Sequence, residues 1–151
     1  MLKFVPALSD VVMEEIPGRV SLAVEISNCQ GNCAGCHSPF LKEDIGEQLT
    51  LDRALSLIDD NFGVNCFLLL GEGNDPEALR ALARDLRSAD GHILLALYSG
   101  RSVVEDDLYE LFDYVKVGPY IAEKGPLNSP TTNQRLYFHG KDITSSFWRK
   151  K

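Results

Sequence analysis

The sequence has 151 residues, which is enough for one hydrophobic core, and it predicts a single domain over residues 1–151. Its 15 basic and 22 acidic residues give a formal net charge of −7, which argues against nucleic-acid binding because that requires a basic face. No apolar run approaches the roughly 20 residues needed to cross a bilayer, and Pro6 interrupts the apolar start before a secretory segment could form. We therefore expect a cytoplasmic protein without a membrane partner.

Short apolar runs alternate with amphipathic stretches, which is typical of an α/β protein with a mostly parallel sheet. The first strand is predicted over residues 19–27. A helix is predicted over 50–61, with Thr50 as its N-cap. The second strand, 64–70, is apolar almost throughout, as expected when both faces of a strand are covered. Within it, Cys66 is interpreted as a small buried hydrophobic residue.

The next helix is predicted to open at Asp75, an N-cap, with Pro76 in the first helical position. A third strand follows over 92–98. The third helix is expected to begin at Ser102, because Glu105 lies three residues further on and the two residues match a capping box.

A fourth strand is predicted over 114–117, and the apolar run 136–138 is a candidate for another. Three of the strands end in loops with glycine, at 71–75, 99–101 and 118–119. Ligands of parallel α/β proteins bind at the carboxyl ends of the strands, and glycine lets a ligand approach the backbone closely. We therefore expect these three loops, together with the loop after the first strand, to meet at one edge of the sheet.

Three of the four cysteines follow the first strand with the spacing Cys-x3-Cys-x2-Cys, at Cys29, Cys33 and Cys36. In a reducing compartment this crowding favours a metal over disulfides. A structural zinc site would need a fourth ligand, either His37, directly after Cys36, or the distant Cys66. A ferredoxin would need four cysteines for each cluster. A cubane cluster with one iron left open to a small molecule fits three thiolates better.

This cysteine spacing resembles the cluster motif of the radical S-adenosylmethionine superfamily. From about residue 18 to 138 the chain resembles the activating proteins of anaerobic ribonucleoside-triphosphate reductase. The further matches are Gly-Glu-Gly-Asn at 71–74, Tyr-Ser-Gly at 98–100 and Asn-Gln-Arg at 133–135. Two departures are a histidine, His37, at a position that is often aromatic, and a glutamate, Glu72, between two glycines that are usually adjacent.

The resemblance implies a 4Fe–4S cluster on Cys29, Cys33 and Cys36, and S-adenosylmethionine as the second cofactor. It implies no catalytic side chain beyond these cluster ligands. The residues that it places at S-adenosylmethionine are His37, Gly71, Glu72, Gly73 and Ser99. Alternatives from the residues themselves are a solvated carboxylate for Glu72, a helix cap for Asp75, a simple turn for Ser99 and Gly100, and an ion pair for Arg135. Glu25 is a further candidate for the same side of the sheet.

The implied activity is reductive cleavage of S-adenosylmethionine to a 5′-deoxyadenosyl radical, which forms a glycyl radical on a large partner enzyme. The partner implied is anaerobic ribonucleotide reductase, with flavodoxin or ferredoxin as electron donor. The short chain favours an incomplete (βα) half-barrel of about four to six strands, with the cluster loop after the first strand. The alternatives are a radical enzyme with another target, and a non-catalytic binding module stabilised by zinc or a cluster.

Overall fold

The structure, a computed structural model, describes residues 2–6, 10–12, 16, 19–26, 46–61, 63–73, 75–118, 123–124 and 132–145. Of the predicted site residues, Gly71, Glu72, Gly73 and Ser99 are among these. The predicted cluster ligands and the residue that follows them lie outside the described residues; they are Cys29, Cys33, Cys36 and His37.

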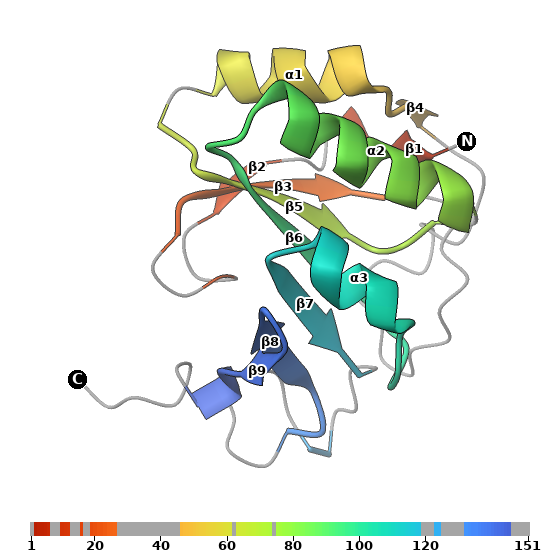
Figure 1. The fold of residues 1–151 in the computed structure, drawn as a ribbon, viewed down its shortest axis with the longest axis vertical. Coiled ribbons are helices and arrows are strands. Elements are labelled where there is room, and N and C mark those ends of the chain that lie inside the picture. Colours follow the sequence, from red (N-terminus) through yellow and green to blue (C-terminus); the bar gives the residue numbers. More distant parts are fainter. Residues whose placement is uncertain are drawn as a thin grey trace.

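Within the described residues, the main sheet has seven strands in the order β2-β3-β5-β6-β7-β8-β9 (Figure 1). Four neighbouring strands are parallel: β3 (Ser21–Glu25), β5 (Cys66–Leu70), β6 (Leu94–Tyr98) and β7 (Tyr114–Val117). Antiparallel strands flank them: β2 (Asp10–Val12) on one side, β8 (Arg135–Phe138) and β9 (Lys141–Asp142) on the other. A separate antiparallel pair joins β1 (Lys3–Phe4) to β4 (Glu47–Gln48). The predicted α/β class with a parallel central sheet is confirmed.

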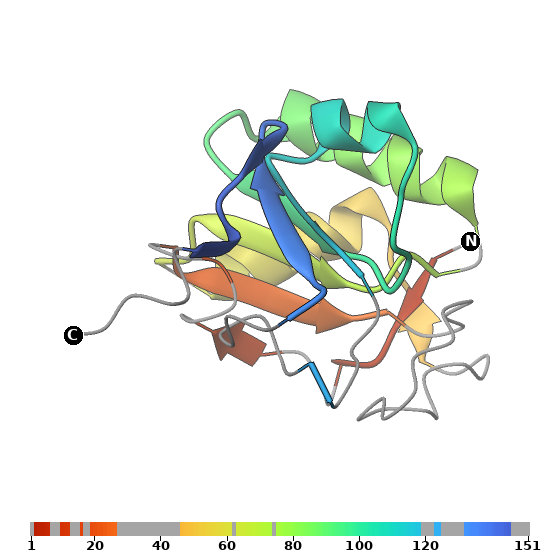
Figure 2. The same ribbon diagram turned by 90° about the horizontal axis from the view of Figure 1, so that it is seen from below.

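Three helices cover one face of this sheet: α1 (Leu51–Asp60), α2 (Pro76–Ala89) and α3 (Asp106–Leu111) (Figure 2). Side chains alternate between the two faces along each strand, so every second residue meets the helices. The larger hydrophobic cluster lies between the helices and the sheet, and it includes Ala54, Leu79, Leu86, Leu108, Leu22, Val24, Phe67, Leu69, Leu95, Leu97 and Val115. All three helices thus contribute side chains to this cluster.

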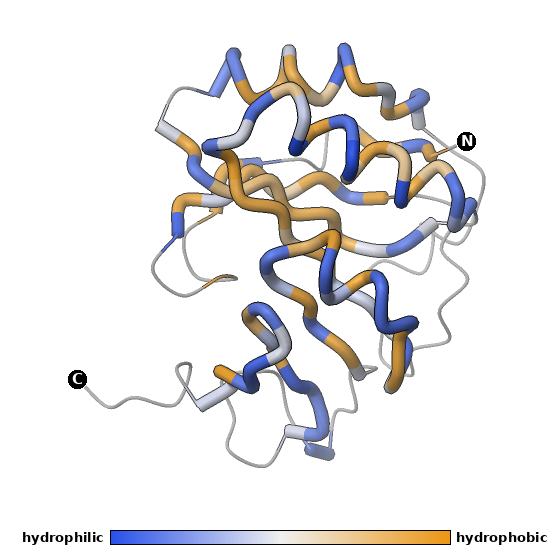
Figure 3. Tube along the Cα trace, in the orientation of Figure 1, coloured by the Kyte–Doolittle hydropathy of each residue, from blue (hydrophilic) through white to orange (hydrophobic). Residues whose placement is uncertain are grey.

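The other face of the sheet carries a second hydrophobic cluster, built from Ile16, Ala23, Cys66, Leu68, Ala96, Tyr114 and Leu136. The parallel strands are therefore apolar on both faces, as the nearly continuous hydrophobic colour of β3, β5 and β6 in Figure 3 shows. Cys66 is fully buried, and burial raises the pKa of its thiol to about 11. Its interpretation as a small buried hydrophobic residue is confirmed.

Two of the predicted helix caps are present. Thr50 Oγ1 accepts a hydrogen bond from the Arg53 backbone N–H at 3.1 Å, and Asp75 Oδ1 accepts one from the Ala78 N–H at 3.1 Å, with Pro76 as first residue of α2. The interpretation of Asp75 as a helix cap is thus confirmed.

The predicted start of the third helix is wrong. Helix α3 begins at Asp106 after an N-cap at Glu105, whose side chain makes no cap hydrogen bond. The Glu105 carboxylate is instead bound by two guanidinium groups, those of Arg80 and Arg101. A capping box from Ser102 would need this carboxylate to turn back onto the backbone, and the ion pairs with the two arginines prevent that.

Other predicted boundaries also differ from those in the structure. Strand β6 begins at Leu94 and not at His92, because the Asp90 carboxylate accepts hydrogen bonds from the N–H groups of His92 (3.0 Å) and Ile93 (3.3 Å) and holds them in a turn. The part of the chain that the structure describes already places seven strands in the main sheet where about four to six were expected, since short antiparallel strands extend both margins. The described strands form an open sheet, with β2 at one margin and β9 at the other.

Within the described residues, no helix combines the length and apolar character required to span a bilayer.

Candidate functional site

The carboxyl ends of the four parallel strands are level with one another. A ladder of backbone hydrogen bonds continues across them beyond the strands: Ile26 N–H to Leu70 O at 3.2 Å, Gly71 N–H to Tyr98 O at 3.0 Å, and Ser99 N–H to Lys116 O at 2.8 Å. The loops after β5, β6 and β7 therefore start from one edge. Their predicted convergence is confirmed within the described part of the chain.

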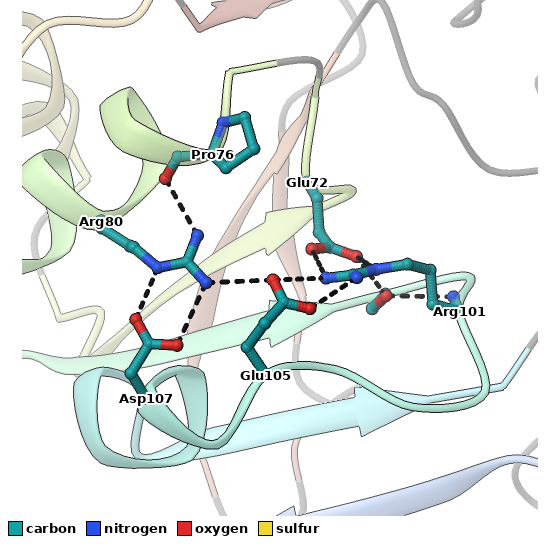
Figure 4. Close-up of polar contacts among 7 residues, drawn as sticks. Glu72, Pro76, Arg80, Arg101, Glu105 and Asp107 are labelled. Carbon is teal, nitrogen blue, oxygen red and sulfur yellow. Dashed lines mark hydrogen bonds and ion pairs between the residues drawn. The ribbon is translucent and has the colours of Figure 1, made fainter.

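Glu72 is the acidic residue of the loop after β5, and its carboxylate is held from the next loop along the sheet. It accepts hydrogen bonds from the Ser99 hydroxyl and from Arg101, whose Nε and Nη2 lie at 2.9 and 2.6 Å (Figure 4). Its side chain is 19% exposed. Two of the predicted site residues, Glu72 and Ser99, are thus in direct contact, and Glu72 is not a solvated loop carboxylate.

Ser99 does more than form a turn. It is fully buried, and its hydroxyl oxygen accepts a hydrogen bond from the Arg101 backbone N–H at 3.0 Å while its O–H bonds to Glu72. A hydroxyl can do both because it has one donor and two acceptor positions. The Ser99 side chain therefore fixes the loop after β6 and the loop after β5 to each other.

The two glycines beside Glu72 adopt backbone conformations that other residues rarely take. Gly71 has a φ of 120° and Gly73 a φ of 71°. Both lie in the region where a side chain is strained. This explains physically why glycine stands on each side of the carboxylate.

Arg101, which the sequence analysis did not single out, lies at the centre of the site's charged groups. Its Nη1 and Nη2 also bond to Glu105 at 2.6 and 3.2 Å. Arg80 Nη2 bonds to Glu105 at 3.0 Å, and Arg80 Nε to Asp107 at 2.5 Å. We call these five residues, Glu72, Arg101, Glu105, Arg80 and Asp107, the charge chain (Figure 4). The i, i+4 spacing of Arg101 and Glu105 was the available sequence signal.

The charge chain sets the protonation of its central carboxylate. Hydrogen bonds from Arg101 and then from Arg80 lower the pKa of Glu105 to about 2. The pKa of Arg101 is raised, chiefly by its hydrogen bonds to Glu72 and Glu105. These groups are therefore fully charged at neutral pH.

A second group of polar side chains lies on the sheet face opposite the helices. One row of residues is paired in register across the four parallel strands, just before the loops begin. The row consists of Glu25, Leu70, Tyr98 and Lys116. Leu70 and Tyr98 pack on the second hydrophobic cluster, which assigns the row to that face. Burial raises the pKa of the Glu25 carboxyl.

Lys116 is only 8% exposed although it carries a charge. Its ammonium lies 5.2 Å from the centroid of the Tyr98 ring and donates to the Gly118 carbonyl at 3.3 Å. Gln134 Nε2 donates to the same carbonyl at 3.3 Å. Of the Asn-Gln-Arg triplet at 133–135, Gln134 thus reaches this edge of the sheet. Arg135 instead forms an ion pair with Asp142 at 3.8 Å, which confirms the alternative interpretation of this residue.

Among the described residues no group of three or more His, Cys, Asp and Glu side chains is placed to hold a metal ion, and the predicted cluster ligands lie outside that part of the chain. No family model matches the sequence, and neither the curated proteins nor the solved structures contain a match.

Proposed function

We propose that this protein is an iron–sulfur enzyme of the radical S-adenosylmethionine type that forms a glycyl radical on a partner enzyme. One observation carries the proposal. The cysteine triad begins at Cys29, only three residues after Ile26, and Ile26 lies on the edge of the sheet where the loops of Glu72, Ser99 and Gly118 meet. A three-thiolate motif and a polar, glycine-bearing edge are thus adjacent along the chain.

The strand order supports an open half-barrel. The strands β3, β5, β6 and β7 follow one another without reversal, and all three helices lie on the same face. A doubly wound sheet reverses its strand order and carries helices on both faces, whereas a (βα) barrel proceeds in one direction with its helices outside. We infer that the face bearing Glu25, Tyr98 and Lys116 is the inner face of the half-barrel.

The chemistry of the available side chains fits the two cofactors. Cys29, Cys33 and Cys36 supply three thiolates for a 4Fe–4S cluster. When bound, the cluster supplies the electron that cleaves the sulfonium of S-adenosylmethionine. An ionised carboxylate has about four acceptor positions, and Glu72 uses three of them, so one remains for the ammonium of the methionyl group. Lys116 offers a positive charge to the methionyl carboxylate.

With both cofactors bound, the reaction would require one electron from an external donor. That electron would cleave the bond between sulfur and the 5′ carbon and release methionine. The 5′-deoxyadenosyl radical would then take a hydrogen atom from a glycine Cα of the partner, giving 5′-deoxyadenosine and a glycyl radical. We propose anaerobic ribonucleotide reductase as the partner and flavodoxin or ferredoxin as the electron donor. An open half-barrel suits a protein substrate because a loop of the partner can enter it.

The direct test is anaerobic reconstitution with iron and sulfide, followed by dithionite and S-adenosylmethionine. We expect 5′-deoxyadenosine from the wild type and none from Cys29→Ala, Cys33→Ala or Cys36→Ala, which should also lose cluster iron. Cys66→Ala is the matched control, since Cys66 is buried in the second hydrophobic cluster, and it should retain both. Absence of product from a wild type with a full cluster would refute the proposal, and one zinc without iron would favour a binding module.

A further inference from the structure

We infer that Arg101 is a positioning residue that fixes the Glu72 carboxylate for S-adenosylmethionine binding. The inference rests on the proposed function and extends it to a residue outside the predicted site. Arg101 binds Glu72 through two of its nitrogens, at 2.9 and 2.6 Å. Such a two-point contact fixes the orientation of a carboxylate as well as its position.

Arg101 is bonded to all three described loops at the carboxyl edge. Its side chain bonds to Glu72 in the loop after β5, and its backbone N–H bonds to the Ser99 hydroxyl at 3.0 Å in the loop after β6. Its carbonyl accepts the Gly118 N–H at 2.7 Å in the loop after β7. Loss of the guanidinium would remove both contacts of Arg101 with Glu72 but leave both backbone bonds in place. The side chain can therefore be tested separately from the loop framework.

The Glu72 loop needs such a restraint from outside. Glu72 stands between two glycines with positive φ, and glycine loses more conformational freedom on ordering than any other residue. Without Arg101, the Ser99 hydroxyl would be the one side-chain donor left to the carboxylate among the described residues. A ligand would then have to order the loop as it binds. This cost appears in affinity, because the reacting atoms are unchanged once the ligand is bound.

Arg101 is itself held in place by the rest of the charge chain. Glu105 binds its outer nitrogens, and Arg80 binds Glu105 at 3.0 Å from helix α2 (Figure 4). Arg87, also on helix α2, lies outside the charge chain: its Nε bonds to the Leu111 carbonyl at 2.8 Å, and Nη2 pairs with Asp113 at 3.2 Å. Removal of Arg87 would weaken the packing of α2 against α3 and leave both contacts between Arg101 and Glu72. Arg87→Ala is therefore the matched control for loss of an arginine side chain.

The experiment measures 5′-deoxyadenosine formation against S-adenosylmethionine concentration in the cluster-loaded full chain. We expect Arg101→Ala to raise KM about tenfold and to change kcat less than about threefold, the size expected for ordering one loop residue. Arg101→Lys should recover part of the loss, because lysine keeps the charge but not the two-point geometry. Arg87→Ala should keep KM within about twofold of the wild type while its unfolding midpoint falls.

A double-mutant cycle shows whether Arg101 acts through Glu72. If it does, Arg101→Ala added to Glu72→Gln should raise KM no further, because the partner of the guanidinium is already altered. An unchanged KM in Arg101→Ala, an equal rise in Arg87→Ala, or fully additive effects would each overturn the inference while wild-type turnover left the proposed function intact. A wild type that forms no product with a full cluster would instead refute the proposed function, and the inference with it.

Discussion

The ammonium of Lys116 lies 5.2 Å from the centroid of the Tyr98 ring, at the register position where β6 and β7 pair. A cation over an aromatic face is stabilised by about 1 kcal/mol or more when water is excluded. Buried lysines are otherwise costly, so the ring and the Gly118 carbonyl together explain how β7 keeps a charge on this face of the sheet. The pairing also aims the charge at the edge where the three loops meet.

The first prediction concerns Lys116. Lys116→Met keeps most of the side-chain volume and removes the charge, so we expect the KM for S-adenosylmethionine to rise at least about tenfold, as for loss of one charge-assisted contact. The free energy of unfolding should change by less than about 1 kcal/mol, because methionine fills the same space. Kinetics and urea unfolding measure the two effects. Lys141→Met, at an exposed position of β9, is the control and should alter neither.

The second prediction concerns Gly118, which has a φ of 101°. A Cβ at this position would lie 3.1 Å from Gln134 Cα, which is backbone and cannot move aside cheaply. We expect Gly118→Ala to lower the free energy of unfolding by about 2–4 kcal/mol, the sum of backbone strain and overpacking. Chemical denaturation measures this loss.

Gly63 provides the control for backbone strain alone. Its φ is 97°, and a Cβ there would meet nothing within 4 Å. Gly63→Ala should therefore cost only about 1 kcal/mol or slightly more. Equal losses in the two variants would show that the contact between Gly118 and Gln134 is not as close as described.

The third prediction concerns the pH dependence of stability at Glu25. Burial raises the pKa of this carboxyl above its ordinary value of 4.5. The folded state therefore favours the protonated form, and the resulting stabilisation is complete below the unfolded pKa and is lost as the pH rises through the folded pKa. Glutamine stays neutral at every pH. We expect Glu25→Gln to be more stable than the wild type at about pH 7 and equally stable near pH 4.

Urea unfolding at the two pH values measures this difference. Glu110→Gln is the control, because it removes one acidic charge at an exposed position of helix α3. A Glu25→Gln variant that is less stable than the wild type at neutral pH would show that the ionised carboxylate is stabilised in the folded protein. That result would contradict the raised pKa.

Local sequence signals predicted much of the fold. Thr50 and Asp75 cap their helices through backbone groups three residues away, so their role can be inferred from one turn of sequence. Strand β7 was predicted with its observed bounds, because Tyr114, Val115 and Val117 favour a strand and lie between a helix and a glycine. The start of α3 was missed, because Glu105 is bound by Arg80, which is 25 residues away in the sequence.

The sequence by itself determined the α/β class, the N-caps of the first two helices and the grouping of glycine-bearing loops at the strand ends, because each depends on periodicity or on neighbours within one turn. Only the tertiary structure decided which polar groups meet at that edge. Arg101 and Glu72 are 29 residues apart, and Tyr98 and Lys116 face each other only because β6 and β7 pair in one register. Contacts between distant residues depend on how strands and helices pack, and no local pattern records them.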